Sequence, residues 1–339
     1  MVVVLDYNKL VDPDCDLYQY IDDAFGNKPG ALGACFVSNV PGFPELREKC
    51  LRYGSQLAAL SQSELDSMVD LESCYMFGWS HGKEIMNGKA DFAKGSFYFN
   101  PLHDVPASED PEFAAKFVEY GRPNIWPPSL PQMKHDLMEL GQLIIKVGKL
   151  VALHCDKYIS KKHPDLPPNF LQSMIEQSMI PKSRLLHYFP ISKEDAEPTP
   201  DGSMDSWCGL HIDHSVLTGL TSAMYNDESD PSFPQVDTSN KDIQDALKDA
   251  GLYIKDKDEK FTQVKIPKEY LAFQIGEAAQ VASKEALLAT PHLVRGAAYP
   301  NMSRNTLALF MQPNVDQELM PGYTFHDFTK DIMARHYEQ

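Results

Sequence analysis

The C-terminal half of this sequence is a succession of short apolar runs, and this pattern constrains the fold more than any other feature. The runs are bounded by turn-forming Gly, Pro, Asn and Asp and contain many β-branched and aromatic residues. They lie at 184–189, 210–225, 251–254, 261–266, 270–275, 292–295 and 306–311. Many short strands in succession predict a closed or double-sheet β architecture.

Helical patterns come before these strands. A proline-rich connector at 121–131 precedes six apolar residues at steps of three and four, which mark one face of a long helix. These residues are Met133, Leu137, Leu140, Ile144, Val147 and Val151. We interpret His154, on the same stripe, as a buried core histidine. We also predict a strand at 33–39, a helix from Pro44 to about Met68 and a closing helix at 325–336.

The predicted fold class is therefore mainly β with flanking helices. An N-terminal α/β cover is expected at 1–120, the connector and long helix at 121–180, the β core at 181–315 and a C-terminal helix at 316–339. With 339 residues in total, these segments are expected to form one integrated unit.

The charge of the chain argues against several classes of partner. With 31 basic and 48 acidic residues, the formal net charge is −17, which disfavours nucleic acid and anionic membranes. No apolar run reaches the roughly 20 residues of a membrane span, and the N-terminus does not resemble a signal peptide. The six cysteines lie far apart, as in reduced thiols of a cytoplasmic protein. A metal site would therefore use histidine and carboxylate.

His211 and Asp213 are the strongest candidate metal ligands. Side chains two residues apart on a strand point the same way, so the imidazole and the carboxylate can bind one ion together. His292, at the start of another strand, is the best third ligand, and such a set leaves about three octahedral positions open, as in non-haem Fe(II) oxygenases. Chance alone yields about one such triplet, so a polar pair at a strand end is the alternative. A second triplet, at 163–165, lies in a proline-rich loop and is assigned to the surface.

Arg304 and Thr306 are likewise two residues apart on one predicted strand. A guanidinium offers a planar fork to a carboxylate, and a neighbouring hydroxyl can complete the clasp. Such a clasp near an open iron site suits a dicarboxylate co-substrate. The alternative is a surface arginine that pairs with one of the many acidic residues.

Taken together, these residues resemble the 2-oxoglutarate and Fe(II)-dependent dioxygenase superfamily, in its isopenicillin N synthase-like branch. The elements that carry the resemblance are Val3-Val-Leu-Asp6, Ala34 to Val40, Asn124-Ile-Trp-Pro127, His211 to Thr218, Gly251-Leu, Gly276-Glu and Arg304 to Phe310 with Pro313. The resemblance implies a distorted double-stranded β-helix, or jelly roll, wrapped by helices. It also implies Fe(II) on His211, Asp213 and His292, with Arg304 and Thr306 holding the far carboxylate of 2-oxoglutarate.

The resemblance further implies that O2 and 2-oxoglutarate yield succinate and CO2 while a small substrate is hydroxylated, desaturated or cyclised. The chain departs from the family pattern in the longer interval from Asp213 to His292, in the longer interval from His292 to Arg304, and in the residues before Pro190. Where the family often has Asn-Tyr-Tyr before a proline, this chain has His187-Tyr188-Phe189, so Tyr188 or His187 is expected to replace the tyrosine that touches the co-substrate. Arg295 competes with Arg304 for the clasp, although no hydroxyl lies two residues beyond it.

Three functions compete. The leading one is a 2-oxoglutarate-dependent dioxygenase of a small molecule, and the second is an iron oxidase of the same branch that does not use 2-oxoglutarate. The third is a non-catalytic metal-binding jelly roll. A zinc hydrolase is disfavoured because the chain lacks a helical HExxH motif. The acidic charge mildly favours a neutral or cationic substrate, and the protein is expected to be a monomer or a weak homo-oligomer.

Overall fold

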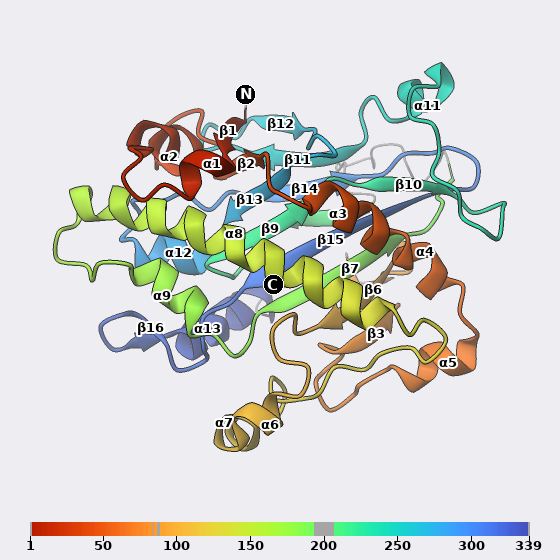
Figure 1. Cartoon of the computed structure of the whole chain (residues 1–339), viewed down its shortest axis with the longest axis horizontal. Helices are drawn as coiled ribbons and strands as arrows, with labels where there is room; N and C mark the ends of the chain where they lie inside the picture. The colour runs from red at the N-terminus through yellow and green to blue at the C-terminus, as the bar shows by residue number, and fades with distance from the viewer. Residues whose placement is uncertain (1, 84, 87–88, 193–206, 338–339) are drawn as a thin grey trace.

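The computed structural model describes residues 2–83, 85–86, 89–192 and 207–337, which are arranged around two β-sheets (Figure 1). Counted over these residues, the larger sheet has nine strands in the order β1-β2-β13-β9-β15-β7-β6-β3, with β10 also paired to β15. They are β1 (Val3–Asp6), β2 (Ala34–Ser38), β3 (Gly78–His81), β6 (Lys94–Phe99), β7 (Lys182–Tyr188), β9 (Leu217–Thr221), β10 (Met224–Asp227), β13 (Leu271–Ile275) and β15 (Met302–Met311). Apart from the parallel β1–β2 pair, these strands pair antiparallel.

The second sheet faces the first. Over the described residues it has four antiparallel strands in the order β12-β11-β14-β8. These are β8 (Cys208–His211), β11 (Gly251–Lys255), β12 (Phe261–Val264) and β14 (His292–Arg295). Phe36 and Ala272 of the larger sheet share an apolar cluster with Ile254 and Val264 of the smaller one. Two facing sheets of short strands form the predicted jelly-roll core, so the predicted fold class is confirmed.

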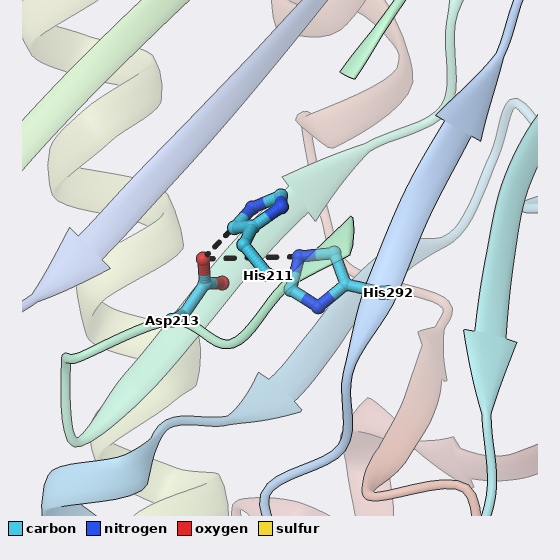
Figure 2. Close-up of side chains that lie close together, drawn as sticks. All are labelled: His211, Asp213 and His292. Atoms are coloured by element: carbon cyan, nitrogen blue, oxygen red, sulfur yellow. Dashed lines mark ion pairs between the residues drawn. The ribbon is translucent and has the colours of Figure 1, made fainter. Parts of the chain in front are cut away.

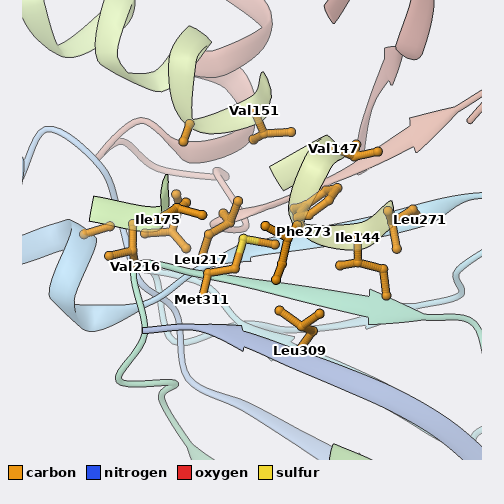
Figure 3. Close-up of a cluster of buried hydrophobic side chains, with 14 of the residues drawn as sticks. Ile144, Val147, Val151, Ile175, Val216, Leu217, Leu271, Phe273, Leu309 and Met311 are labelled. Carbon is orange, nitrogen blue, oxygen red and sulfur yellow. The ribbon is translucent and has the colours of Figure 1, made fainter. Parts of the chain in front are cut away.

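The long helix α8 (Met133–Lys162) crosses the other face of the larger sheet, where it contacts β9 and β15 (Figure 1). All six residues of the predicted apolar stripe are buried. Figure 3 shows Ile144 and Val151 of this stripe in one cluster with Phe273 of β13 and Met311 of β15. The helix therefore closes the core on the side of the sheet that faces away from β8 and β14.

The helix predicted from Pro44 to about Met68 is wrong as a single element, because the chain forms three short helices there. They are α3 (Phe43–Leu51), α4 (Tyr53–Ala58) and α5 (Gln62–Ser67). Gly54 has a low helix propensity, and it packs so closely on Asn305 that a Cβ would lie 2.3 Å from the Oδ1 atom. The hydroxyl of Ser61 then accepts a hydrogen bond from the first turn of α5 and starts a new helix.

The remaining elements flank the two sheets. The helices are α1 (Tyr7–Leu10), α2 (Tyr18–Phe25), α6 (Pro106–Glu109), α7 (Pro111–Lys116), α9 (Phe170–Glu176), α11 (Lys241–Ala246), α12 (Glu277–Ala282) and α13 (Phe325–Tyr337), and the short strand pairs are β4 (Ile85–Met86) with β5 (Lys89–Ala90) and β16 (Glu318–Met320) with β17 (Tyr323–Thr324). Helix α13 is the closing helix that the sequence predicts. His154 is buried, as predicted, and its Nε2 lies 3.2 Å from the carbonyl oxygen of Leu10. None of the described helices is both long and apolar enough to cross a membrane.

The larger sheet joins segments that are far apart in the sequence. Strands β1, β2, β3 and β6 come from the predicted N-terminal cover, and β7, β9, β10, β13 and β15 come from the predicted β core. Backbone hydrogen bonds therefore link the cover directly to the strands that position the candidate site.

Gly148 of α8 allows the helix to approach the sheet closely, and we predict that its replacement destabilises the fold. A Cβ at this position would lie 2.3 Å from Cε of Met311 and 3.3 Å from Cε1 of Phe273. Glycine-to-alanine changes in a helix normally stabilise it by about 1 kcal/mol. We expect Gly148→Ala instead to lower the free energy of unfolding by about 1–3 kcal/mol, because no space for a methyl group remains between the helix and the sheet at this position.

Urea unfolding measures this effect. Lys146→Ala, at an exposed position of the same helix, is the control and should change the free energy of unfolding by less than about 0.5 kcal/mol. A Gly148→Ala protein more stable than wild type would contradict the close packing of α8 on the sheet.

Candidate active site

His211, Asp213 and His292 lie together where β8 and β14 pair (Figure 2). His211 is the register partner of His292, and their ring centroids are 4.3 Å apart. The Oδ1 atom of Asp213 lies 3.6 Å from Nε2 of His211 and 3.8 Å from Nε2 of His292. One ligand atom from each residue lies within 4.8 Å of the other two, a separation that a single bound cation can bridge.

A β-bulge in β8 directs His211 to this point. His292 pairs with His211 and Val294 pairs with Cys208, so two residues of β8 oppose one residue of β14 between these pairs. A bulge re-aims the neighbouring side chains, and Cys208 and His211 line the same pocket despite their odd spacing. The expectation that Asp213 belongs to the same strand is wrong, because β8 ends at His211. The backbone carbonyl of Asp213 instead accepts a hydrogen bond of 2.7 Å from the first amide of α12.

Contacts on the far side of each imidazole orient the two rings. Nδ1 of His211 lies 2.7 Å from the carbonyl oxygen of Gly209, and donation to that oxygen leaves Nε2 to bind a cation. Nδ1 of His292 lies 3.3 Å from the carbonyl oxygen of Thr290, and donation to that oxygen likewise leaves Nε2 of this ring to bind a cation. Outer contacts of this kind fix the tautomer and the ring orientation that a metal ion requires.

The two imidazoles do not ionise independently. Burial lowers the pKa of His211, but Cys208 and Asp213 outweigh burial and raise that pKa to about 9. Burial and the charge on His211 together lower the pKa of His292 to about 4. A metal ion bound by both rings would displace the additional proton that His211 holds and replace its positive charge.

Arg304, Thr306 and Tyr188 line the same pocket as the three candidate ligands. Arg304 and Thr306 are two apart on β15 and point the same way, as expected for a strand. The register places Tyr188 of β7 opposite Arg304, and the guanidinium lies 4.8 Å from the centre of the tyrosine ring. The hydroxyl of Thr306 donates a hydrogen bond of 3.0 Å to the carbonyl oxygen of Thr221.

The guanidinium of Arg304 is buried and has unused hydrogen-bond donors. The residue is 7% exposed, and its Nε and Nη1 atoms have no hydrogen-bond partner within the described part of the chain. Unpaired charged donors away from water are costly. A carboxylate with two oxygens would satisfy these donors, so the position fits one end of a dicarboxylic acid such as 2-oxoglutarate.

Comparisons with known proteins show which fold this is. No protein-family model matches the sequence, and no curated protein matches it. The structure is similar to a 2OG-Fe(II) oxygenase family protein from Caulobacter crescentus, with 17% identity, a TM-score of 0.68 and coverage of 98% of each chain. It is also similar to a Neurospora crassa protein solved in complex with alpha-KG and thymine, with 17% identity and a TM-score of 0.67 over 95% of this chain and 89% of that chain. The chain has the 2OG-Fe(II) oxygenase fold.

A third structure agrees with this assignment. AtDAO1, the dioxygenase for auxin oxidation 1 from Arabidopsis thaliana, was solved with 2-oxoglutarate and is 14% identical, with a TM-score of 0.59 over 95% of this chain and 96% of that chain. The predicted resemblance to 2-oxoglutarate and Fe(II)-dependent dioxygenases is thus confirmed at the level of the fold.

Within this oxygenase fold, Tyr188 is the one of the two residues left open by the sequence, Tyr188 and His187, that lines the pocket. Tyr188 lines the pocket, whereas Nδ1 of His187 lies 2.8 Å from Oδ1 of Asn305. The ring of Phe189 packs edge-on against that of His187, outside the described lining of the pocket. Alternate residues of a strand face opposite sides, so Tyr188 and His187 cannot both line the pocket.

The oxygenase fold also separates the candidate site from the competing arginine and the second histidine–aspartate triplet. Arg295 lies on β14 and is outside the described lining of the pocket, which does include Arg304. The second triplet, at 163–165, follows the end of α8, and its aspartate forms an ion pair with Lys284. Neither feature reaches the group of His211, Asp213 and His292.

Three residues near the site were not predicted from the sequence. Gln274 contacts His292, while Lys182 and Arg184 line a cavity of about 710 Å³ that reaches His211. The period-two pattern of β7 could have indicated Lys182 and Arg184, because they share a face with the predicted Tyr188. No local pattern marks Gln274, whose contact joins strands of different sheets.

Proposed function

We propose that this protein is an Fe(II)- and 2-oxoglutarate-dependent dioxygenase that oxidises a small organic substrate. One observation carries the proposal: a single pocket contains His211, Asp213 and His292 together with the buried, partly unpaired guanidinium of Arg304. Two histidines and one carboxylate are the donor set of non-haem Fe(II) sites, and a guanidinium fork suits a carboxylate.

Each residue has a distinct part in this proposal. His211 and His292 would hold the iron through Nε2, and Asp213 would hold it through a carboxylate oxygen. Arg304 would bind the far carboxylate of 2-oxoglutarate, and the hydroxyl of Thr306 would turn from the Thr221 carbonyl to donate to the same group. When bound, Fe(II) supplies the activation of O2, while the chain positions the co-substrate and keeps water out with buried side chains.

The proposed reaction uses one O2 for each 2-oxoglutarate. One oxygen atom enters succinate as 2-oxoglutarate loses CO2, and the other oxidises the substrate by hydroxylation, desaturation or cyclisation. Structures of the same fold contain thymine, in the Neurospora crassa protein, and 2-oxoglutarate, in AtDAO1. The outer cavity of about 710 Å³ is within the size range of pockets for small organic ligands, which supports a substrate of this class.

Succinate release tests this function. The purified protein is incubated with Fe(II), 2-oxoglutarate and ascorbate in air, and succinate is measured by mass spectrometry. We expect slow release even without a substrate, and none when O2 is removed or when Zn(II) replaces Fe(II). Consumption of O2 without succinate would instead support the iron oxidase, and metal binding without either product would support a non-catalytic protein.

A further inference from the structure

The outer cavity carries positive charges that the proposed function does not use. Lys182 and Arg184 of β7 line it, together with Lys83, which follows β3. The carboxylates in its described lining are Asp213, which belongs to the candidate metal site, and Glu277 at the start of α12. Three cations against two carboxylates give the described lining an excess of positive charge, in a chain whose formal net charge is −17.

Lys182 is the most unusual of these cations. The residue is 6% exposed, and its Nζ atom has no hydrogen-bond partner among the residues that the structure describes. The amine lies 5.2 Å from the ring centre of Phe77 and 5.5 Å from that of Tyr120. Burial lowers the pKa of Lys182 to about 7. Such an amine destabilises the folded protein unless a ligand supplies the missing acceptor.

The strand separates this amine from the co-substrate end of the site. Lys182, Arg184 and Tyr188 share one face of β7, and Tyr188 pairs with Arg304. At about 3.3 Å per residue, Lys182 lies roughly 20 Å along the strand from Tyr188. Arg184 lies between them and donates to Oγ of Ser96 at 2.8 and 3.0 Å, which fixes its guanidinium in place. Two of the candidate metal ligands line both the outer cavity and the pocket that contains Arg304, so the metal site can be reached from both.

We propose that Lys182, assisted by Arg184, binds a carboxylate of the substrate, so that the enzyme acts on a small organic acid. This inference rests on the proposed function, because it assigns the outer cavity to the substrate of that reaction. The amine can donate to a carboxylate oxygen and the guanidinium adds positive charge on the same face of β7, whereas a neutral substrate without an acceptor would leave the amine unpaired. The substrate would then be an anion and not the neutral or cationic molecule expected from net charge, because charges that line a cavity act on a ligand more strongly than distant charges do.

A panel of alkyl and aryl carboxylic acids, each compared with its primary amide, tests the proposal. An amide keeps the shape of the acid and removes its charge. We expect at least one acid, and not its amide, to raise succinate release above the rate seen without a substrate. In Lys182→Met, the half-saturating concentration of that acid should rise at least about tenfold, while the half-saturating concentration of 2-oxoglutarate stays unchanged.

The failure of this inference can be told from the failure of the proposed function. Succinate release without a substrate reports the iron site alone, and its absence would overturn the proposed function. When that release is present, any of three results would overturn the inference. They are equal stimulation by acids and amides, stimulation by no acid, and a Lys182→Met protein with the same half-saturating concentration of the acid as wild type. Lys182→Arg keeps a cation and should keep the preference for acids; the test rests on this variant if Lys182→Met does not fold.

Lys182 also predicts how stability depends on pH. Because Lys182→Met removes an amine that has no described acceptor, we expect it to melt about 2–4 °C above wild type at pH 7. The pKa of Lys182 is lowered from 10.5 to about 7. The loss of folding stability caused by burying its charge is therefore complete below pH 7 and becomes smaller as the pH rises toward 10.5. Burial also raises the pKa of the adjacent Tyr120 above its ordinary value. The difference in melting temperature should therefore narrow with rising pH, and a variant that melts below wild type at pH 7 would mark Lys182 as a structural residue.

Discussion

His211→Ala is expected to lower the rate of succinate release more than about 100-fold. The variant leaves Asp213 and His292 as ligands, and two protein ligands hold a divalent ion poorly. Loss of a mere outer contact to a metal ligand lowers metal affinity by about 10–100-fold, so loss of the ligand itself should exceed this range. Mn(II) should raise the melting temperature of wild type and leave that of the variant unchanged, because only an intact site binds the ion in the folded state.

The chain offers a matched control for this experiment. His163 is followed by a proline and Asp165, so His163→Ala is the same substitution in a triplet of the same form, at the end of α8. We expect this variant to keep the wild-type rate and the stabilisation by Mn(II). The site assignment would be wrong if His211→Ala retained metal binding and turnover, or if His163→Ala lost them.

The second large effect is expected at the co-substrate end of the pocket. Arg304→Met should raise the half-saturating concentration of 2-oxoglutarate by about 100-fold, because a buried, charge-assisted pair contributes about 2–3 kcal/mol and each 1.4 kcal/mol is tenfold. Stabilisation by Mn(II) should be unchanged, because Arg304 is not a candidate metal ligand. The folded state should survive, since two of the guanidinium nitrogens have no described partner to lose.

Arg295→Met is the matched control, because Arg295 is the arginine that competes with Arg304 in the sequence. It lies on β14, outside the described lining of the pocket, and its replacement should leave the dependence on 2-oxoglutarate unchanged. A large effect at Arg295 with none at Arg304 would assign the binding of the 2-oxoglutarate carboxylate to Arg295 on β14. An equal half-saturating concentration in wild type and Arg304→Met would instead favour an oxidase that does not use 2-oxoglutarate.

Much of the candidate site follows from local geometry and could therefore be predicted. The pairing of Arg304 with Thr306 on one strand face needs only the period of two, and both residues line the pocket. The stripe of α8 is equally local, because its period of 3.6 places the apolar residues on one side. The closeness of His292 to His211 depends on how the strands pair in the assembled fold, and no local rule relates two strands so far apart in sequence.

The features that the sequence did not predict depend on contacts between distant segments. The break between α3 and α4 falls at Arg52, and the close packing of Gly54 of α4 on Asn305 is likewise a contact that a helical pattern alone does not reveal. The choice of Tyr188 over His187 depends on which face of β7 lines the pocket, and pairing with β6 and β15 sets that face. The isolation of Lys182 is also a property of the assembled fold, because the sequence contains 48 acidic residues that could have paired with it.

The bulge in β8 lets Cys208 and His211 face the same pocket although they are three residues apart. Residues two apart on a regular strand also share a face, so a chain with one residue fewer between Cys208 and His211 would lose the bulge and still direct the imidazole to the pocket. A regular strand of the present length would instead turn the imidazole to the opposite side of the sheet. Homologous chains should therefore have either this interval with a bulge or one residue fewer without it, while the connection between β10 and α11 can gain or lose residues more freely.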